Sequence, residues 1–155
     1  RALACAAENL QRLGCADRVS LQLTDLFPQA EAGDPPLKAD LIVCNPPWLP
    51  GKPSSPIEGA IYDPNSQMLK GFLAQVKQHL TQTGEAWLIL SDLAEHLRLR
   101  TREELERWIQ EGGLQVLGRV DVRPHHPKAM DSQDPLHAAR SAELTSLWRL
   151  GHLPT

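Results

Sequence analysis

Four consecutive residues, Asn45-Pro46-Pro47-Trp48, combine groups suited to holding a flat amine. The two prolines stiffen the backbone and lack N–H groups, so the turn offers carbonyl acceptors without competing donors. Asn45 adds a neutral side-chain acceptor, and Trp48 supplies a broad ring for stacking. An NH₂ group would be held by two acceptor oxygens, one for each of its hydrogens, and by an aromatic ring stacked against its plane. The tetrad therefore suits methylation of a weakly nucleophilic nitrogen, such as an exocyclic base amine or a carboxamide.

This chemistry would depend on positioning rather than on a strong base. Holding both N–H bonds turns the nitrogen lone pair toward the incoming methyl group, and such positioning can supply roughly 7–11 kcal/mol of the barrier. The neutral hydrogen bonds add about 1 kcal/mol each. The proton becomes acidic only after the methyl group has arrived. Asn-Pro-Pro is also ordinary turn chemistry, so the residues alone leave a purely structural turn as an equal alternative.

The elements around the tetrad favour a functional site. Residues 40–44 form a short continuous apolar run, which is typical of a strand buried on both faces in a parallel sheet. The tetrad follows this run directly. Open α/β sheets bind their ligands beyond the carboxyl ends of such strands. We therefore expect Asn45 to emerge beside the ligand crevice.

The rest of the chain alternates between helical and strand patterns. We expect a helix over residues 2–13 that stops at Gly14, and a helix that starts at Asp63-Pro64 and closes at Gly84. Thr101 and Glu104 form a capping box for a helix that ends at Gly112-Gly113. Strands are predicted at residues 19–23, 40–44, 86–90, 114–122 and 144–150, with a polar loop at 123–141. This order predicts one α/β domain over residues 1–155, with a largely parallel sheet and an antiparallel final strand.

Composition excludes several classes of protein. The chain has 155 residues, 41% of them apolar, and a net charge of −3, which argues against disorder and against a strongly basic nucleic-acid surface. No stretch approaches the roughly 20 apolar residues that a bilayer requires, so no membrane partner is expected. Three cysteines without C-x-x-C spacing are typical of buried free thiols, which favours a cytoplasmic protein. Because the chain begins at Arg1 within a helical pattern, we expect a piece of a longer protein.

Three segments, residues 7–10, 19–27 and 40–48, carry a resemblance to a known family. The chain resembles the class I S-adenosylmethionine-dependent methyltransferases, in the Asn-Pro-Pro-aromatic branch of small-domain ribosomal RNA, N6-adenine and glutamine N5 methyltransferases. The resemblance covers roughly residues 1–122. It implies a Rossmann-like fold, S-adenosylmethionine as cofactor, and an RNA base or a glutamine of a ribosomal or translation-factor protein as methyl acceptor.

The resemblance also assigns residues. The aspartate that commonly contacts the cofactor adenine falls on Asp25, with Leu26 beside it, and Asn45 would serve both cofactor and acceptor. The catalytic tetrad would be Asn45, Pro46, Pro47 and Trp48. The family's glycine-rich loop and ribose-binding acidic residue are absent from this sequence. Both precede the first helix, so we expect a fold that lacks its first strands.

Other polar residues allow two interpretations each. Asp121, His125, His126 and His137 match no zinc spacing, and no metal is expected. Arginines at 98, 100, 102 and 107 alternate with glutamates, which favours ion pairs on a helix over nucleic-acid contacts. A weaker RNA-facing rim would comprise Arg119, Arg123, Lys128 and Arg140.

Two further segments lie close to the predicted crevice. The loop at residues 49–62, with Glu58 and Tyr62, is either a substrate lid or a rigid connector. Ser91-Asp92 either faces the crevice or caps a helix. Trp87, Trp108 and Trp148 fall within predicted elements and are expected in the core.

The sequence thus predicts a nitrogen-directed methyltransferase. The alternative is a methyltransferase-like fold without catalysis, kept as a binding or assembly module. A glycine-rich loop upstream of Arg1 would favour the hypothesis of an enzyme. The absence of such a loop would favour the hypothesis of a binding or assembly module. A nicotinamide-dependent oxidoreductase shares the α/β pattern, but it gives no reason for Asn-Pro-Pro-Trp and ranks last.

Overall fold

The computed structural model describes residues 1–30, 33–51, 61–124, 133 and 137–154. The chain forms two compact units, Arg1–Leu37 and Lys38–Thr155. The expectation of a single domain over the whole chain stays a prediction. None of the described helices is long and apolar enough to cross a bilayer.

The first unit holds helix α1 (Ala2–Arg12) and a 3₁₀ turn, η1 (Ala16–Arg18). Gly14 lies beyond the helix at φ 64°, in the left-handed region that ends helices, as predicted. The prediction of a strand at residues 19–23 was wrong: this segment is unpaired in the described unit, and Leu23 is 90% exposed. Alternation of apolar residues cannot make a strand without a neighbour to complete its hydrogen-bond ladder.

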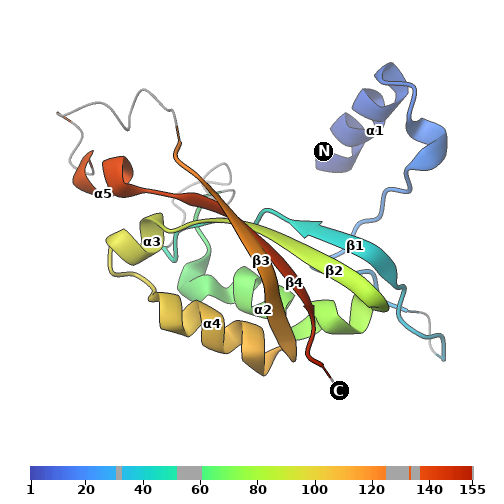
Figure 1. The fold of residues 1–155 in the computed structure, drawn as a ribbon. Helices are drawn as coiled ribbons and strands as arrows, with labels where there is room; N and C mark the ends of the chain where they lie inside the picture. Colours follow the sequence, from blue (N-terminus) through green and yellow to red (C-terminus); the bar gives the residue numbers. More distant parts are fainter. Residues whose placement is uncertain (31–32, 52–60, 125–132, 134–136, 155) are drawn as a thin grey trace. The chain divides into compact units, whose positions relative to one another are not determined.

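The second unit is built on a four-stranded sheet (Figure 1). Its order is β1-β2-β4-β3, comprising β1 (Ala39–Cys44), β2 (Leu80–Ser91), β3 (Leu114–Val122) and β4 (Thr145–His152). β1 and β2 are parallel, whereas β4 runs antiparallel to both of its neighbours. Three strands share one direction, but two of the three pairings are antiparallel, so the sheet is mixed; the antiparallel final hairpin is confirmed.

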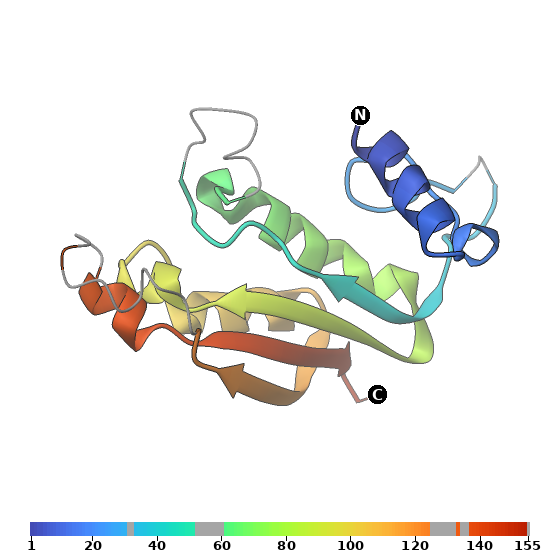
Figure 2. The same ribbon diagram turned by 90° about the horizontal axis from the view of Figure 1, so that it is seen from above.

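Helices α2 (Gln67–Gln75) and α4 (Arg102–Glu111) cover one face of this sheet (Figures 1 and 2). The core lies between them and the strands, and its fully buried side chains include Leu69, Leu73, Leu88, Leu90, Leu105, Ile109 and Leu150. Of the three tryptophans expected there, only Trp148 is buried, while Trp87 and Trp108 are half-buried.

The prediction that residues 40–44 are buried on both faces was wrong. Within the second unit, β1 lies at one edge of the sheet, and α2 and α4 lie on only one face of that sheet (Figures 1 and 2). Cys44 points to the covered side and is 7% exposed, whereas Leu41 and Val43 are 46% and 56% exposed. The apolar run correctly identified a strand but not its place at the sheet edge.

The segment between β1 and β2 departs from the expected single helix. Pro64–Ser66 form a 3₁₀ turn, η3, in which Asn65 and Ser66 have φ values of 56° and 54°. Val76–His79 form a second 3₁₀ turn, η4, so the α-helix itself is short. Gly84 lies inside β2 and closes no helix. A Cβ on Gly84 would lie 2.9 Å from the carbonyl oxygen of Ala39, so the glycine is needed where β1 approaches β2.

The helix at residues 102–111 begins as predicted. Thr101 Oγ1 accepts the Glu104 N–H, and Glu104 Oε2 accepts the Thr101 N–H, which completes the capping box. Two short helices were not predicted: α3 (Leu93–His96) and α5 (His137–Ala142). The second replaces the end of the loop expected at 123–141. Helices of one to two turns are too short to show an apolar stripe in the sequence.

Candidate functional site

The tetrad begins directly after Cys44, at the carboxyl end of β1. Because β1 and β2 are parallel, their carboxyl ends lie at the same end of the sheet. Asn45 is exposed, Pro46 is buried, and Pro47 and Trp48 are half-buried. The indole Nε1–H of Trp48 donates a hydrogen bond of 3.1 Å to Asn45 Oδ1. The structure thus brings the amide and the aromatic ring of the tetrad together.

Both ends of the tetrad are held. Upstream, Cys44 pairs with Leu88 in the sheet. Downstream, the Leu49 N–H donates to the Ile61 carbonyl at 3.1 Å, and the Asp63 N–H donates to the Leu49 carbonyl at 2.7 Å. These bonds fasten the tetrad to the segment that leads into α2. The carbonyl oxygen of Pro46 accepts no hydrogen bond from the described part of the chain.

Asp63 secures this attachment to α2. Its carboxylate accepts the backbone N–H groups of Met68 at 2.8 Å and Leu69 at 3.0 Å, and the residue is 4% exposed. The N–H groups of a first helical turn have no partner within the helix, and a carboxylate satisfies them well. The predicted capping role of Asp63 is confirmed, although the helix that it caps begins at Gln67.

The loop at residues 49–62 is closed at its base. Leu49 and Tyr62 form a bridge, and a Cβ on Gly51 would lie 2.8 Å from the Tyr62 ring. Tyr62 therefore packs on the glycine rather than reaching freely into solvent. Glu58 lies outside the described residues, so the choice between a lid and a connector stays open.

Cys44, the last residue of β1, is buried directly before the tetrad. Burial raises the pKa of its thiol from 9.0 to about 11. A thiol with this pKa is neutral at physiological pH and unreactive, since the thiolate is the nucleophile. Cys5 is exposed and Cys15 is half-buried, so the expectation of three buried thiols was wrong for these two. Cys5 belongs to α1, where no residue of the helix is buried.

The residues assigned to cofactor adenine lie in the first unit. A hollow of about 570 Å³ is lined by Gln22, Leu23, Thr24, Asp25, Pro28 and Gln29. The Thr24 hydroxyl donates to the Phe27 carbonyl and closes the turn that carries Asp25 and Leu26. Asp25 is exposed and Leu26 half-buried. An exposed carboxylate beside apolar side chains is a fitting acceptor for the amine of a planar base.

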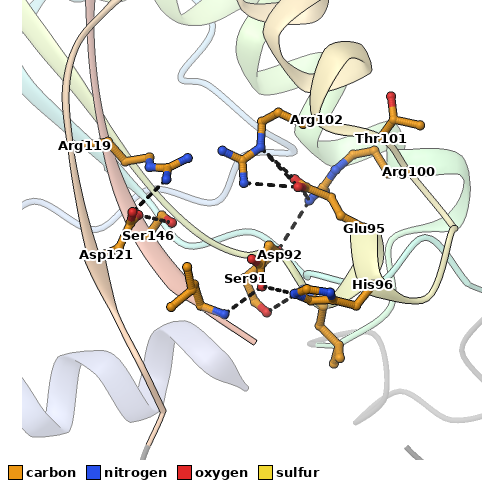
Figure 3. Close-up of polar contacts among 12 residues, drawn as sticks. Ser91, Asp92, Glu95, His96, Arg100, Thr101, Arg102, Arg119, Asp121 and Ser146 are labelled. Atoms are coloured by element: carbon orange, nitrogen blue, oxygen red, sulfur yellow. Dashed lines mark hydrogen bonds and ion pairs between the residues drawn. The ribbon is translucent and has the colours of Figure 1, made fainter. Parts of the chain in front are cut away.

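A buried polar cluster lies at the carboxyl end of β2 (Figure 3). The Ser91 hydroxyl donates to the Glu143 carboxylate and accepts the Leu93 N–H at 3.0 Å. Asp92 Oδ1 accepts the Leu144 N–H at 2.7 Å and lies 3.4 Å from His96 Nε2. Asp92 precedes α3 but makes no side-chain cap bond. Its carboxylate joins the end of β2 to the start of β4 instead.

Sequence reasoning missed Glu143. It lies in a polar stretch between α5 and β4, and no local pattern marks a glutamate that a distant serine will bind. Its burial becomes visible only once β4 is placed beside β2.

Three of the four arginines at 98, 100, 102 and 107 form ion pairs among the described residues, but only Arg107 pairs with one of the glutamates that alternate with them. Glu95 accepts from Arg102 at 3.1 Å and lies 3.7 Å from Arg100, and Arg107 lies 3.9 Å from Glu111. Desolvation lowers the pKa of the buried Arg100. Glu95 supplies one carboxylate for two of these guanidinium groups, so the ion pairs do not decide against the nucleic-acid alternative.

A second pair belongs to the predicted RNA-facing rim. Arg119 binds Asp121 at 2.7 Å (Figure 3). The guanidinium groups of Arg102 and Arg119 each lie 5.0 Å from the Trp148 ring. The rim stays a prediction, because Lys128 lies outside the described residues. Within those residues, no group of three His, Cys, Asp or Glu side chains is placed to hold a metal ion. His125 and His126 also lie outside them.

Comparisons with known proteins identify the fold. No family model and no curated protein matches the sequence. An S-adenosylmethionine-dependent methyltransferase from Clostridium acetobutylicum superposes with a TM-score of 0.55 at 16% identity, over 96% of this chain and 71% of the other. A geranyl diphosphate methyltransferase solved with its cofactor gives 0.57 at 13% identity, over 94% of this chain and 62% of the other.

A third similar structure is mitomycin 7-O-methyltransferase, with a TM-score of 0.56 at 14% identity. The match covers 96% of this chain and 38% of the other, so the chain spans only part of each of these proteins. Identities this low establish architecture alone. The chain has the Rossmann-like fold of the S-adenosylmethionine-dependent methyltransferases.

Proposed function

We propose that this chain is part of a methyltransferase that transfers a methyl group from S-adenosylmethionine to a planar NH₂ nitrogen. The acceptor would be an RNA base or a glutamine of a ribosomal or translation-factor protein, and the protein would act in the cytoplasm. The fold supports the general class. The choice of nitrogen depends on the tetrad alone, because several of the similar structures, mitomycin 7-O-methyltransferase among them, are O-methyltransferases.

One observation carries the proposal: two oxygens suited to an amine lie in one stiff turn. Asn45 Oδ1 is exposed and uses one lone pair on Trp48. The Pro46 carbonyl has no partner among the described residues. An incoming NH₂ group would donate one hydrogen to each oxygen. The half-buried ring of Trp48 would stack against the plane of the acceptor.

S-adenosylmethionine would supply a methyl group on positively charged sulfur. Asp25 is suited to accept a hydrogen bond from its adenine amine, and Leu26 to pack on the ring. Asp25 lies in a hollow that also contains the apolar side chains of Leu23 and Pro28.

Methyl transfer to separate acceptor pools tests the proposal. Full-length protein is incubated with tritiated S-adenosylmethionine and either total RNA or protein extract, and the methylated atom is identified after digestion. Asn45→Ala should lower the rate about 10²-fold or more, by analogy with loss of an oxyanion-hole donor. Gln82→Ala, which changes an exposed residue near the other end of β2, is the matched control.

Methylation of oxygen, or an Asn45→Ala rate equal to that of the control, would contradict the proposal. Absence of transfer to either pool would favour the alternative of a non-catalytic binding module.

A further inference from the structure

The contact between Trp48 and Asn45 determines which end of the amide is presented. A carboxamide has an acceptor oxygen and a donor NH₂ of nearly equal size, so either end can face a ligand. Indole nitrogen only donates. The bond from Trp48 Nε1 therefore selects the oxygen of Asn45, at 3.1 Å. Phenylalanine at this position would select neither end, and a tyrosine hydroxyl can bond to both.

This selection decides what Asn45 can bind. A carbonyl oxygen has two lone pairs, and the indole occupies one of them. The other can accept an N–H from an acceptor molecule. If the amide were reversed, its own NH₂ would meet the NH₂ of the acceptor, and two donors would face each other without a bond.

Both partners of this bond are held in place. Asn45 follows β1, which is paired with β2, and Trp48 precedes Leu49, which makes three backbone hydrogen bonds. Trp48 is half-buried, which limits its side-chain movement. The indole is therefore positioned before any acceptor arrives.

We propose that Trp48 determines specificity by holding Asn45 Oδ1 toward the acceptor, so that the site takes N–H donors and rejects oxygen nucleophiles. This inference rests on the proposed function. A hydroxyl that is to be methylated must lose its proton, and the resulting oxygen would face the lone pair of Asn45 Oδ1 without a hydrogen between them. An amine keeps its hydrogens during attack. Its nitrogen forms the new bond to carbon while the carbon–sulfur bond breaks, the electron pair stays on sulfur, and the surplus proton then leaves to water.

A double-mutant cycle separates orientation from stacking. Trp48→Phe keeps a ring but loses the N–H, and Asn45→Asp places an oxygen at both ends, so that orientation no longer matters. In the wild-type background, Trp48→Phe should lower kcat for transfer to RNA or protein nitrogen about tenfold, the effect of losing one hydrogen bond of typical strength. In the Asn45→Asp background it should lower kcat by about twofold or less. Trp108→Phe, a half-buried tryptophan on α4, should change neither.

If Trp48→Phe lowers kcat by the same factor in the wild-type and Asn45→Asp backgrounds, Trp48 only stacks on the acceptor, and the inference is overturned. A gain of O-methylated product in Trp48→Phe would support it. Failure of transfer to any nitrogen in the wild type would overturn the proposed function itself.

A measurement without turnover tests the contact directly. In ¹⁵N-labelled wild-type protein, the hydrogen of the Trp48 indole N–H should exchange with solvent at least about fivefold more slowly than in Asn45→Ala. In that variant the indole N–H has lost its acceptor oxygen. The signal is assigned by its disappearance in Trp48→Phe. An indole exchange rate that is indifferent to Asn45→Ala would overturn the inference, whatever the acceptor.

Discussion

The Ser91 hydroxyl donates a hydrogen bond to the carboxylate of Glu143, which lies 52 residues further along the chain. Ser91 is fully buried, and Glu143 is 7% exposed. The same hydroxyl oxygen accepts the Leu93 N–H at 3.0 Å, which leaves the hydroxyl proton for Glu143. This hydrogen bond connects the segment before β4 to the carboxyl end of β2. Asn45 follows β1 at the same end of the sheet.

Ser91→Ala should therefore destabilise the protein by about 1–3 kcal/mol, because both a buried carboxylate and a buried N–H lose their partner. Urea unfolding measures the change. Ser141→Ala is the control: this exposed hydroxyl donates only to the Ala138 carbonyl, at 3.1 Å, and its loss should cost about 0.5 kcal/mol or less. Equal effects of the two substitutions would show that the Ser91–Glu143 bond contributes nothing to stability.

Gly112 lies where α4 meets α2, and no larger residue fits there. A Cβ at this position would lie 2.2 Å from the Leu73 carbonyl oxygen, a backbone atom that cannot move alone. Gly112→Ala should cost about 1–3 kcal/mol in urea unfolding, the range for overpacking in a core. A Cβ at Gly118 would meet nothing within 4 Å, so Gly118→Ala should change stability by about 0.5 kcal/mol or less. If the first variant is as stable as the second, the helix packing described here is wrong.

Local signals in the sequence predicted the local structure well. The capping box of Thr101 and Glu104, the helix end at Gly112 and the cap at Asp63 depend on groups a few residues apart, so their chemistry is readable in order along the chain. The strand at residues 40–44 and its parallel partner were also predicted, because long apolar runs are characteristic of sheet strands.

Long-range relationships could not be predicted in this way. Residues 19–23 have the alternation of a strand but no neighbour in their unit, and Gly84 is a strand residue because β1 approaches it closely. Exposure of Val43 likewise depends on its surroundings, because α2 and α4 lie on one face of the sheet and Val43 points to the other (Figure 2). Each of these depends on what lies beside a segment, which its own residues do not encode.

For the candidate site, residue types predicted the tetrad but not its internal contact. Asn45 was expected to bind an acceptor and Trp48 to stack on it, as separate functions. The bond between them depends on the rotamers of both side chains, which residue types alone do not determine. The catalytic roles of these residues, and the cofactor role of Asp25, stay predictions.

The ion pair between Glu85 and Arg149 should make stability depend on pH. Arg149 donates to both carboxylate oxygens, and Trp87 Nε1 donates to one of them at 2.8 Å. The hydrogen bond from Arg149, followed by that from Trp87, lowers the pKa of Glu85 from 4.5 to about 2. Because the folded-state pKa is depressed, the contribution is complete above the unfolded value and is lost as pH falls toward 2.

The Tm difference between wild type and Glu85→Gln should thus be constant above about pH 5 and shrink steadily between about pH 4.5 and 2. Gln82→Ala, which removes no titratable group from β2, should give a difference that hardly changes over this range. A Glu85→Gln difference that is flat with pH would contradict the depressed pKa.

The three thiols of the chain should react at different rates. Burial raises the pKa of Cys44 to about 11, whereas Cys5 is exposed and Cys15 is half-buried. At pH 8 a disulfide reagent such as DTNB should titrate two thiols quickly and the third only after denaturant is added, because reaction needs an accessible thiolate. Cys44→Ala should remove the slow phase alone. If all three thiols of the native protein react with DTNB at the same rate, the Cys44 thiol is accessible.

Asp63 connects the tetrad to the helix that supports it, and removing its carboxylate should separate stability from catalysis. Asp63→Ala leaves the N–H groups of Met68 and Leu69 without an acceptor and should cost about 1–2 kcal/mol in urea unfolding, as for loss of a helix cap. Asp63→Asn keeps one oxygen and should cost less. Asp17→Ala, at an exposed position, is the control and should be nearly neutral.

The backbone bond from Asp63 to Leu49 survives all substitutions at this position, since it uses the N–H and not the side chain. Methyl transfer by folded Asp63→Ala should therefore fall by less than about tenfold, far less than for Asn45→Ala. A loss as large as that of Asn45→Ala would mean that the carboxylate itself holds the tetrad in its active geometry, and that the backbone bonds around Leu49 are insufficient.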